Sequence, residues 1–281
     1  MNNISVRGMT KKFNDFTLGG VSFDVPAGSV VGFIGENGAG KSTTIKGILG
    51  LIAPNGGGAY VFGKPAASLS KEDKNRIGAV LGENCLPENL TLKEVSVVMK
   101  HIFTAWQDSA FFAFADRFAL PRDKKIREFS RGMQQKAALA VALSHGAELL
   151  ILDEPTSGLD PVARDEILDI LYDFMQDERH SVLISSHIVS DLEKLCDYIV
   201  FIHGGKIVFA EEKDVLKEKY ALFRGSAEEL AALGQSAVAA YMRGDFGMSA
   251  LVYRGEVPAG TPLERAGIED IMLYYARGER V

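Results

Sequence analysis

The residues best suited to chemistry lie in a glycine-rich loop near the N-terminus. Residues 35–44 read GENGAGKSTT and match the pattern G-x-x-x-x-G-K-[ST]. In this pattern, successive backbone N–H groups surround phosphate oxygens, the lysine ammonium reaches the outer phosphates, and the last hydroxyl ligates Mg²⁺. The loop therefore predicts a nucleotide-phosphate site in which Ser42 is also a metal ligand. The binding residues that it indicates are Gly35, Asn37, Gly38, Ala39, Gly40, Lys41, Ser42 and Thr43.

A second group of candidate residues is a pair of acids that follows an apolar run. Residues 149–155 read LLILDEP, which is typical of a buried strand that delivers Asp153 and Glu154 to the carboxyl edge of a sheet, where ligands bind in open α/β folds. We expect Asp153 to lie near Mg²⁺. We expect Glu154 to orient or deprotonate the water that attacks a γ-phosphate. Without the phosphate loop, the same acids would be typical of the start of an ordinary loop.

His187 follows the apolar run at 181–186, again at the end of a predicted strand. Because parallel strands end at the same edge of a sheet, His187 is predicted to join the other site residues and to take part in catalysis. The other histidines lack this context and are predicted to be structural or on the surface: His101, His145, His180 and His203.

Phe13 lies before the phosphate loop in the otherwise polar segment MTKKFND. An exposed aromatic ring there would offer a stacking platform for a base, worth about 1–3 kcal/mol and indifferent to base identity. The alternative is a core phenylalanine, because Phe16 is a neighbour with similar properties. Both interpretations stay open at this point.

The elements that must position these residues are visible in the apolar periodicity. An apolar run at 29–34 leads into the phosphate loop, and helical spacing follows over 42–52. Later β-rich runs with helices between them indicate a parallel sheet with crossover helices. Residues 84–146 are predicted to be an inserted helical subdomain, whereas 1–63 alternate short β-like runs with turns. The later strands are predicted at 149–153, 181–186 and 198–202.

The last part of the chain carries no chemical motif. We expect residues 1–220 to form one domain and residues 221–281 to form a small appended subdomain. Its final helix, GIEDIMLYYARG, places apolar residues on one face at Ile268, Ile271, Met272 and Tyr275. This subdomain could act as a dimer contact, a regulatory element or a packing appendage.

Composition narrows the function classes. The chain has 281 residues, of which 47% are hydrophobic, and a formal net charge of -6, which provides no basic footprint for nucleic acid. Cys85 and Cys196 show no C-x-x-C spacing and are predicted to be ordinary packing residues. The N-terminus has no apolar leader, and no run reaches about 18 apolar residues. We therefore expect a cytoplasmic chain whose membrane role would require another polypeptide.

The motifs GENGAGKST, EFSRGMQQK, LLILDEPTSGLDP and SSHIVSDLE occur in this order and resemble the nucleotide-binding subunit of an ATP-binding cassette (ABC) transporter over about residues 2–212. The resemblance implies an α/β fold: a P-loop NTPase parallel-sheet core with an N-terminal antiparallel β subdomain, an inserted helical subdomain and a small C-terminal α+β appendage. It implies that Ser130 and Gly132, in the signature motif, complete the ATP site of a second subunit. It further implies a D-loop ending at Asp160 and favours Phe13 as the aromatic platform.

Two segments depart from the family pattern. The usual signature is LSGGQ, whereas residues 129–133 read FSRGM, so that Ser130 and Gly132 keep the key residue types. The family also usually has a metal-sensing glutamine after the strand within IGAVLGEN. The ungapped match is Gly82, and the adjacent Glu83 is a candidate metal ligand, because a carboxylate oxygen suits Mg²⁺. The alternative is that Glu83 is a solvated loop acid.

The resemblance also implies partners and cofactors. It implies ATP and Mg²⁺ as cofactors, and a homodimer or heterodimer of ATPase subunits bound to separate permease subunits at the cytoplasmic face of the cell membrane. The whole sequence resembles bacterial ATPase subunits of exporters with ABC-2-type permeases, including the YtrB-like group. No nucleic-acid partner is expected. The alternative is a soluble ABC ATPase acting on nucleic acid or ribosomes, although such proteins usually carry two cassettes, a long coiled coil or basic segments.

Overall fold

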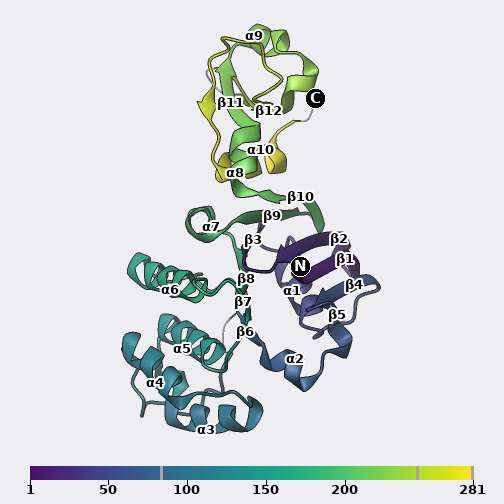
Figure 1. Cartoon of the computed structure of the whole chain (residues 1–281). Helices are drawn as coiled ribbons and strands as arrows, with labels where there is room; N and C mark the ends of the chain where they lie inside the picture. Colours follow the sequence, from purple (N-terminus) through teal and green to yellow (C-terminus); the bar gives the residue numbers. More distant parts are fainter. Residues whose placement is uncertain (83–84, 245–246, 280–281) are drawn as a thin grey trace.

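The computed structural model of this chain describes residues 1–82, 85–244 and 247–279, and Figure 1 shows its parts around a central sheet. That sheet has the strand order β10-β9-β3-β8-β7-β6, in which only β10 is antiparallel to its neighbour among the described strands. Every residue of β3, β7 and β8 is buried, as expected of apolar strands covered on both faces. The strands are β3 (Val30–Ile34), β6 (Ile77–Leu81), β7 (Leu149–Asp153), β8 (Ser181–Ser186), β9 (Tyr198–His203) and β10 (Lys206–Glu212).

An antiparallel sheet of order β2-β1-β4-β5 packs beside the central sheet, which confirms the predicted N-terminal β subdomain. The two sheets share one hydrophobic core, in which the rings of Phe23 and Phe33 lie 5.2 Å apart. Helix α1 (Lys41–Ile48) also packs into this core through Ile45 and Ile48. The strands are β1 (Asn2–Lys12), β2 (Thr17–Pro26), β4 (Gly56–Val61) and β5 (Lys64–Pro65).

Helix α1 ends earlier than its apolar spacing over 42–52 predicts. Gly50 adopts a left-handed φ of 69°, the Gly50 N–H donates to the Gly47 carbonyl, and the Leu51 N–H donates to the Lys46 carbonyl at 2.9 Å. These are the bonds of a Schellman motif, which closes a helix at a glycine. Gly50 was therefore the available signal for the true end of the helix.

The predicted inserted helical subdomain is present between β6 and β7. Helix α5 buries most of its residues, whereas α3 keeps Val97 and Ile102 exposed. Helices α6 (Pro161–Phe174) and α7 (Val189–Leu195) then make the crossovers from β7 to β8 and from β8 to β9. The segment before the insertion holds η1 (Ala66–Ser68) and α2 (Lys71–Asn75), and the insertion holds α3 (Leu92–Ile102), α4 (Asp108–Arg117), η2 (Ile126–Glu128) and α5 (Arg131–Leu143).

A third sheet, of order β12-β13-β11-β14, lies at the end of the molecule far from the helical insertion (Figure 1). Helix α10 (Ile268–Arg277) buries Ile268 and Ile271 as its periodicity predicts, and these join the same core cluster as Leu192 of α7. Apolar packing therefore continues from the central sheet into this part. Its other elements are α8 (Lys213–Lys219), β11 (Tyr220–Gly225), α9 (Ala227–Ala232), η3 (Gln235–Ala237), β12 (Val238–Gly244), β13 (Gly247–Tyr253) and β14 (Glu264–Arg265).

The two cysteines differ. Cys196 is a packing residue as predicted: it is buried, and burial raises the pKa of its thiol. Cys85 is exposed, and its thiol contacts the carbonyl oxygens of Leu81 and Gly82, so the packing prediction is wrong for this residue. In the part of the chain that the structure describes, no helix has the length and apolar character needed to cross a bilayer.

Candidate nucleotide site

The phosphate loop joins the end of β3 to α1, and close packing requires its glycines. A methyl group at Gly35 would lie 2.5 Å from the carbonyl oxygen of Ile202. Gly40 has a φ of 112°, which L side chains rarely adopt. Because α1 begins at Lys41, the N–H groups of its first turn have no acceptor within the helix and point toward the loop, together with the positive end of the helix dipole. This geometry suits an anion.

Lys41 connects this loop to the end of β7. Its side chain is buried, and its Nζ donates to the Gly35 carbonyl at 2.7 Å and lies 3.1 Å from Oε1 of Glu154. The approach to Oε1 is close but poorly aligned, so this buried oxygen accepts no hydrogen bond in the structure. The lysine charge is therefore held at the loop by backbone and carboxylate oxygens, which phosphate oxygens resemble as acceptors.

Glu154 shows the most unusual backbone in the site. It has a φ of 53°, which is costly for a residue with a side chain and is typical of functional positions. Its N–H donates to Oγ of Ser185 at 3.0 Å, and its Oε2 lies 2.6 Å from Nδ1 of His187. The structure thus brings Lys41, Glu154 and His187 into one chain of contacts at the carboxyl edge of the central sheet, as the strand ends predict.

Asp153 is also held in place at this edge. It is 6% exposed, and its Oδ1 accepts a hydrogen bond from Oγ of Ser185 at 2.6 Å. Ser185 therefore positions both acids, a role that the sequence analysis missed. The available signal was a polar residue in an apolar run, two positions before His187.

The Asp153 carboxylate and the Ser42 hydroxyl suit a magnesium ion whose other ligands are phosphate oxygens and waters. Among the described residues, no three His, Cys, Asp or Glu side chains lie close enough together to hold a metal by themselves. Mg²⁺ usually binds through one or two carboxylates, several waters and phosphate oxygens. Asp153 and the Ser42 hydroxyl supply hard oxygen ligands of that kind, and Ser42 lines the pocket described next.

A pocket of about 540 Å³ opens over the phosphate loop. Phe13 lines it with 49% of its surface exposed, so the interpretation of Phe13 as a core residue is wrong. Phe16 also lines the pocket, with its ring 6.4 Å from that of Phe13, and also packs on the core. Phe16 is therefore a second aromatic ring at the pocket, which its sequence context did not single out. The pocket residues are Phe13, Asp15, Phe16, Glu36, Asn37, Gly38, Gly40, Lys41, Ser42, Thr43 and Glu154.

The residues of the signature and D-loop segments lie elsewhere. Ser130 caps the N-terminus of α5, with its Oγ accepting the Met133 N–H at 3.3 Å, and Asp160 caps α6. The N–H groups of Ala163 and Val162 donate to Asp160, which lowers the pKa of its carboxyl group. Ser130, Gly132 and Asp160 are not among the described residues that line the pocket.

Gly132 lies beside the D-loop segment, since a methyl group there would lie 3.3 Å from Cδ2 of Leu159. The two segments are therefore packed together, at the N-terminal ends of α5 and α6. Glu83 lies outside the described residues. Gly82, just before it, has a φ of 64° and donates its N–H to the Asp153 carbonyl at 3.4 Å.

Two of the remaining histidines do not converge on the site, whereas Nδ1 of His203 lies 4.0 Å from Oε2 of Glu36, which lines the pocket. His145 is buried and stacks on Phe103 with ring centroids 3.9 Å apart, and its two ring nitrogens contact the carbonyl oxygens of Val141 and Ile77. His180 stacks on Phe174. Both are structural, as predicted.

A glycine-rich loop between a strand and a helix, with two acids at the end of β7 in the same parallel sheet, indicates a P-loop nucleotide-hydrolysing protein. Comparison with known proteins gives the family. The family model described as ABC transporter matches residues 18–157. The lantibiotic transport ATP-binding protein SrtF of Streptococcus pyogenes is 34% identical over 223 residues, which are 78% of this chain and 95% of SrtF. The chain belongs to the ABC transporter ATP-binding proteins, and it is an ATPase of that family.

Two further proteins support the same family assignment. The bacitracin transport ATP-binding protein BcrA of Bacillus licheniformis is 36% identical over 201 residues, which cover 71% of this chain and 66% of BcrA. A solved structure of an ATP-binding subunit of an ABC transporter superposes on this chain with a TM-score of 0.69 at 28% identity. The superposition covers 76% of this chain and 91% of that subunit. The P-loop fold class expected from the sequence is thereby confirmed.

Proposed function

We propose that this chain hydrolyses MgATP to drive an ABC-2-type exporter permease. The contact chain from Lys41 through Glu154 to His187 supports the proposal most directly, because it joins a phosphate-facing cation, a candidate base and a group that orients the base. In this proposal the Glu154 carboxylate accepts the proton of the attacking water. His187 contacts Oε2, while Oε1 lies beside the Lys41 ammonium and accepts no hydrogen bond, so both oxygens of the proposed base are held in place.

Ser42 and Asp153 are proposed to hold the magnesium ion, which would neutralise charge on the outer phosphates. The Ser185 hydroxyl fixes the Asp153 carboxylate for this role. Phe13 is proposed to stack on the base, since its exposed ring lies at the pocket. Glu83 remains a candidate ligand from the loop after β6.

A second copy of the chain, or a related subunit, is proposed to complete each ATP site. Ser130 and Gly132 lie at the N-terminal end of α5, where N–H groups can meet an anion, yet they do not line the pocket of their own chain. Asp160 lies on the segment packed against them. These positions support contact with the nucleotide of a partner subunit, with ATP between the two.

The proposed partners are ABC-2-type permease subunits, with the ATPase at the cytoplasmic face of the membrane. SrtF and BcrA are named for lantibiotic and bacitracin transport, which supports an exporter. The net charge of -6 favours a protein partner over nucleic acid. Residues 1–220 are proposed as the ATPase domain and 221–281 as an appended subdomain. Co-purification of a permease from detergent-solubilised membranes tests the partner, and isolation with ribosomes would contradict it.

Glu154→Gln tests the mechanism. The amide fills the same space but accepts no proton, so turnover should fall by roughly a hundredfold or more while MgATP binding persists. The variant should also accumulate as an ATP-bound dimer in light scattering. Glu178→Gln is the matched control, because Glu178 is exposed and does not line the pocket. Parental turnover in Glu154→Gln would remove Glu154 from the role of base.

A further inference from the structure

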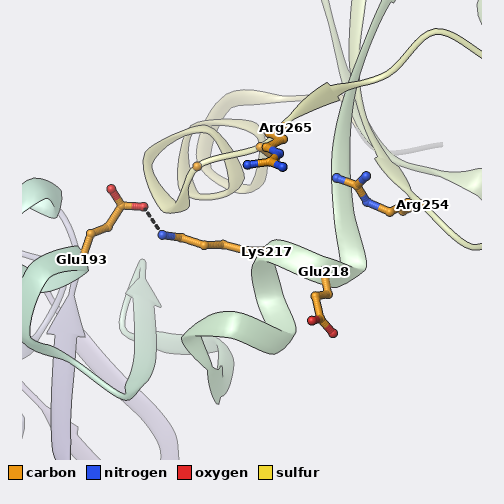
Figure 2. Close-up of a pocket in the computed structure, with 7 residues that line it drawn as sticks. Glu193, Lys217, Glu218, Arg254 and Arg265 are labelled. Carbon is orange, nitrogen blue, oxygen red and sulfur yellow. Dashed lines mark ion pairs between the residues drawn. The ribbon is translucent and has the colours of Figure 1, made fainter.

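A second cleft, of about 640 Å³, lies between α7 of the central part and the appended sheet (Figure 2). Its volume is within the range of about 300–1,000 Å³ that is typical of small-molecule sites. It shares no lining residue with the nucleotide pocket. The residues that line it are Glu193, Lys217, Glu218, Arg254, Arg265, Ala266 and Gly267.

Two arginines line this cleft. Figure 2 shows the side chain of Arg254, in the turn after β13, extending toward Arg265 on β14. Within residues 1–82, 85–244 and 247–279, neither guanidinium makes an ion pair or a side-chain hydrogen bond. Each presents five N–H donors in a planar fork that matches phosphate or carboxylate oxygens. Two like charges in one cleft repel, and an anion bound between them would offset that repulsion.

The acids that line the cleft do not neutralise this arginine pair. Oε1 of Glu193 lies 3.2 Å from Nζ of Lys217 and accepts the N–H of Ile268, also at 3.2 Å. Figure 2 shows Glu218 pointing away from Arg254 and Arg265. The lining acids thus leave both guanidinium groups available to a ligand.

The start of α10 adds little to the site, because it is already capped. Oδ2 of Asp270 accepts the Gly267 N–H at 2.9 Å, and Glu193 takes the next N–H. A nearby arginine is also already paired: Arg224 on β11 lies 3.4 Å from Glu264. The anion-binding capacity of the cleft therefore comes from Arg254 and Arg265.

We propose that this cleft binds a small phosphate-bearing molecule between Arg254 and Arg265. A phosphate group offers several acceptor oxygens and up to two negative charges, so it can bond both forks at once, whereas a single carboxylate has only two oxygens. The phosphate could belong to a soluble ester or to a lipid headgroup. The site is distinct from the phosphate loop and does not depend on the proposed transport function.

Inorganic pyrophosphate is the first probe, titrated by calorimetry into the full chain carrying Lys41→Ala, which removes the phosphate-loop lysine. We expect binding that Arg254→Gln with Arg265→Gln weakens by roughly tenfold or more, as expected for the loss of charge-assisted bonds. Arg277→Gln is the matched control, because Arg277 is an exposed arginine at the other end of α10. Arg254→Lys with Arg265→Lys keeps the charge but loses the forks, and should give an intermediate affinity.

Vesicles containing phosphatidylglycerol distinguish the two sources of phosphate. Co-sedimentation that requires Arg254 and Arg265 would assign the site to a lipid headgroup. Arginine-dependent pyrophosphate binding without co-sedimentation would assign it to a soluble ester. Thermal unfolding curves of each variant establish that it is folded. Binding of neither probe, or equal pyrophosphate affinity in the double glutamine variant and the Arg277→Gln control, would overturn the proposal.

Discussion

The carboxyl edge of the central sheet and the cleft beside the appended sheet hold their charges in different ways. At the sheet edge, Lys41 and Asp153 are buried and Glu154 has strained backbone, and each of these residues touches a partner. In the cleft, Arg254 and Arg265 are exposed; Arg254 lies in the turn after β13, and Arg265 lies in the short strand β14. Bond-breaking chemistry requires atoms fixed to fractions of an ångström, whereas recognition of an anion can rely on charge and a fork geometry.

The largest effect expected from this difference is at Lys41. Lys41→Ala removes the buried cation beside Glu154 and should weaken MgATP binding by roughly a hundredfold or more. Equilibrium titration with a fluorescent ATP analogue measures the loss. Lys46→Ala, an exposed lysine in the last turn of the same helix, should bind like the parent. Equal affinity in both variants would contradict the phosphate-loop assignment.

Two serine caps with the same local role test whether the two regions differ in function. Ser130 caps α5 and Ser226 caps α9, each by accepting a backbone N–H. Either serine-to-arginine change removes a cap worth about 1 kcal/mol. Only Ser130→Arg should lower turnover, by roughly tenfold or more, because a bulky cation would displace the proposed contact to the partner's nucleotide. Nucleotide affinity of the isolated monomer should persist in both, and a matching loss of turnover in Ser226→Arg would contradict the assignment.

A cavity in the appended part should lower the free energy of unfolding and leave MgATP binding unchanged. Ile271 is fully buried, so Ile271→Ala should lower the free energy of unfolding by about 2–5 kcal/mol. Leu273→Ala on the exposed face of α10 is the control and should cost far less, since Leu273 is 39% exposed. Urea unfolding measures both, beside MgATP titrations at low denaturant. A loss of MgATP affinity in folded Ile271→Ala would show that the appended part supports the nucleotide site directly.

The smallest effect expected is a pH dependence from His145. Burial lowers the pKa of this histidine below its ordinary value of about 6.5. As the pH falls below that value, the unfolded chain takes up the proton before the folded chain does, so stability should fall by at most about 1.4 kcal/mol per pH unit until the folded-state pKa is reached. Urea midpoints at pH 7.5, 6.5 and 5.5 measure the slope. His145→Gln should flatten the dependence of stability on pH. An unchanged slope in this variant would exclude His145 as the source of the dependence. His101→Gln is the control, because His101 is exposed.

Local patterns predicted best the strands that are buried along their whole length. The runs at 149–153 and 181–186 match β7 and β8 residue for residue. Helix α1 was predicted too long, because apolar spacing continued past Gly50, where a backbone turn rather than hydrophobicity ends the helix. Cys85 shows a similar limit, since residue type alone does not reveal that its side chain is exposed.

The sequence by itself determined which residues of this protein can do chemistry. Phosphate binding requires a loop with glycines, a lysine and a hydroxyl, and an apolar strand followed by two acids places those acids at the carboxyl edge of the sheet. Tertiary structure alone decided which of them meet. His187 and Glu154 come from different strands, and only the parallel pairing of β7 with β8 sets their side chains 2.6 Å apart. The same holds for the exposure of Phe13 and for the placement of Arg254 and Arg265 in one cleft. No local pattern contains such contacts, because each depends on the free energy of packing elements that are distant in sequence.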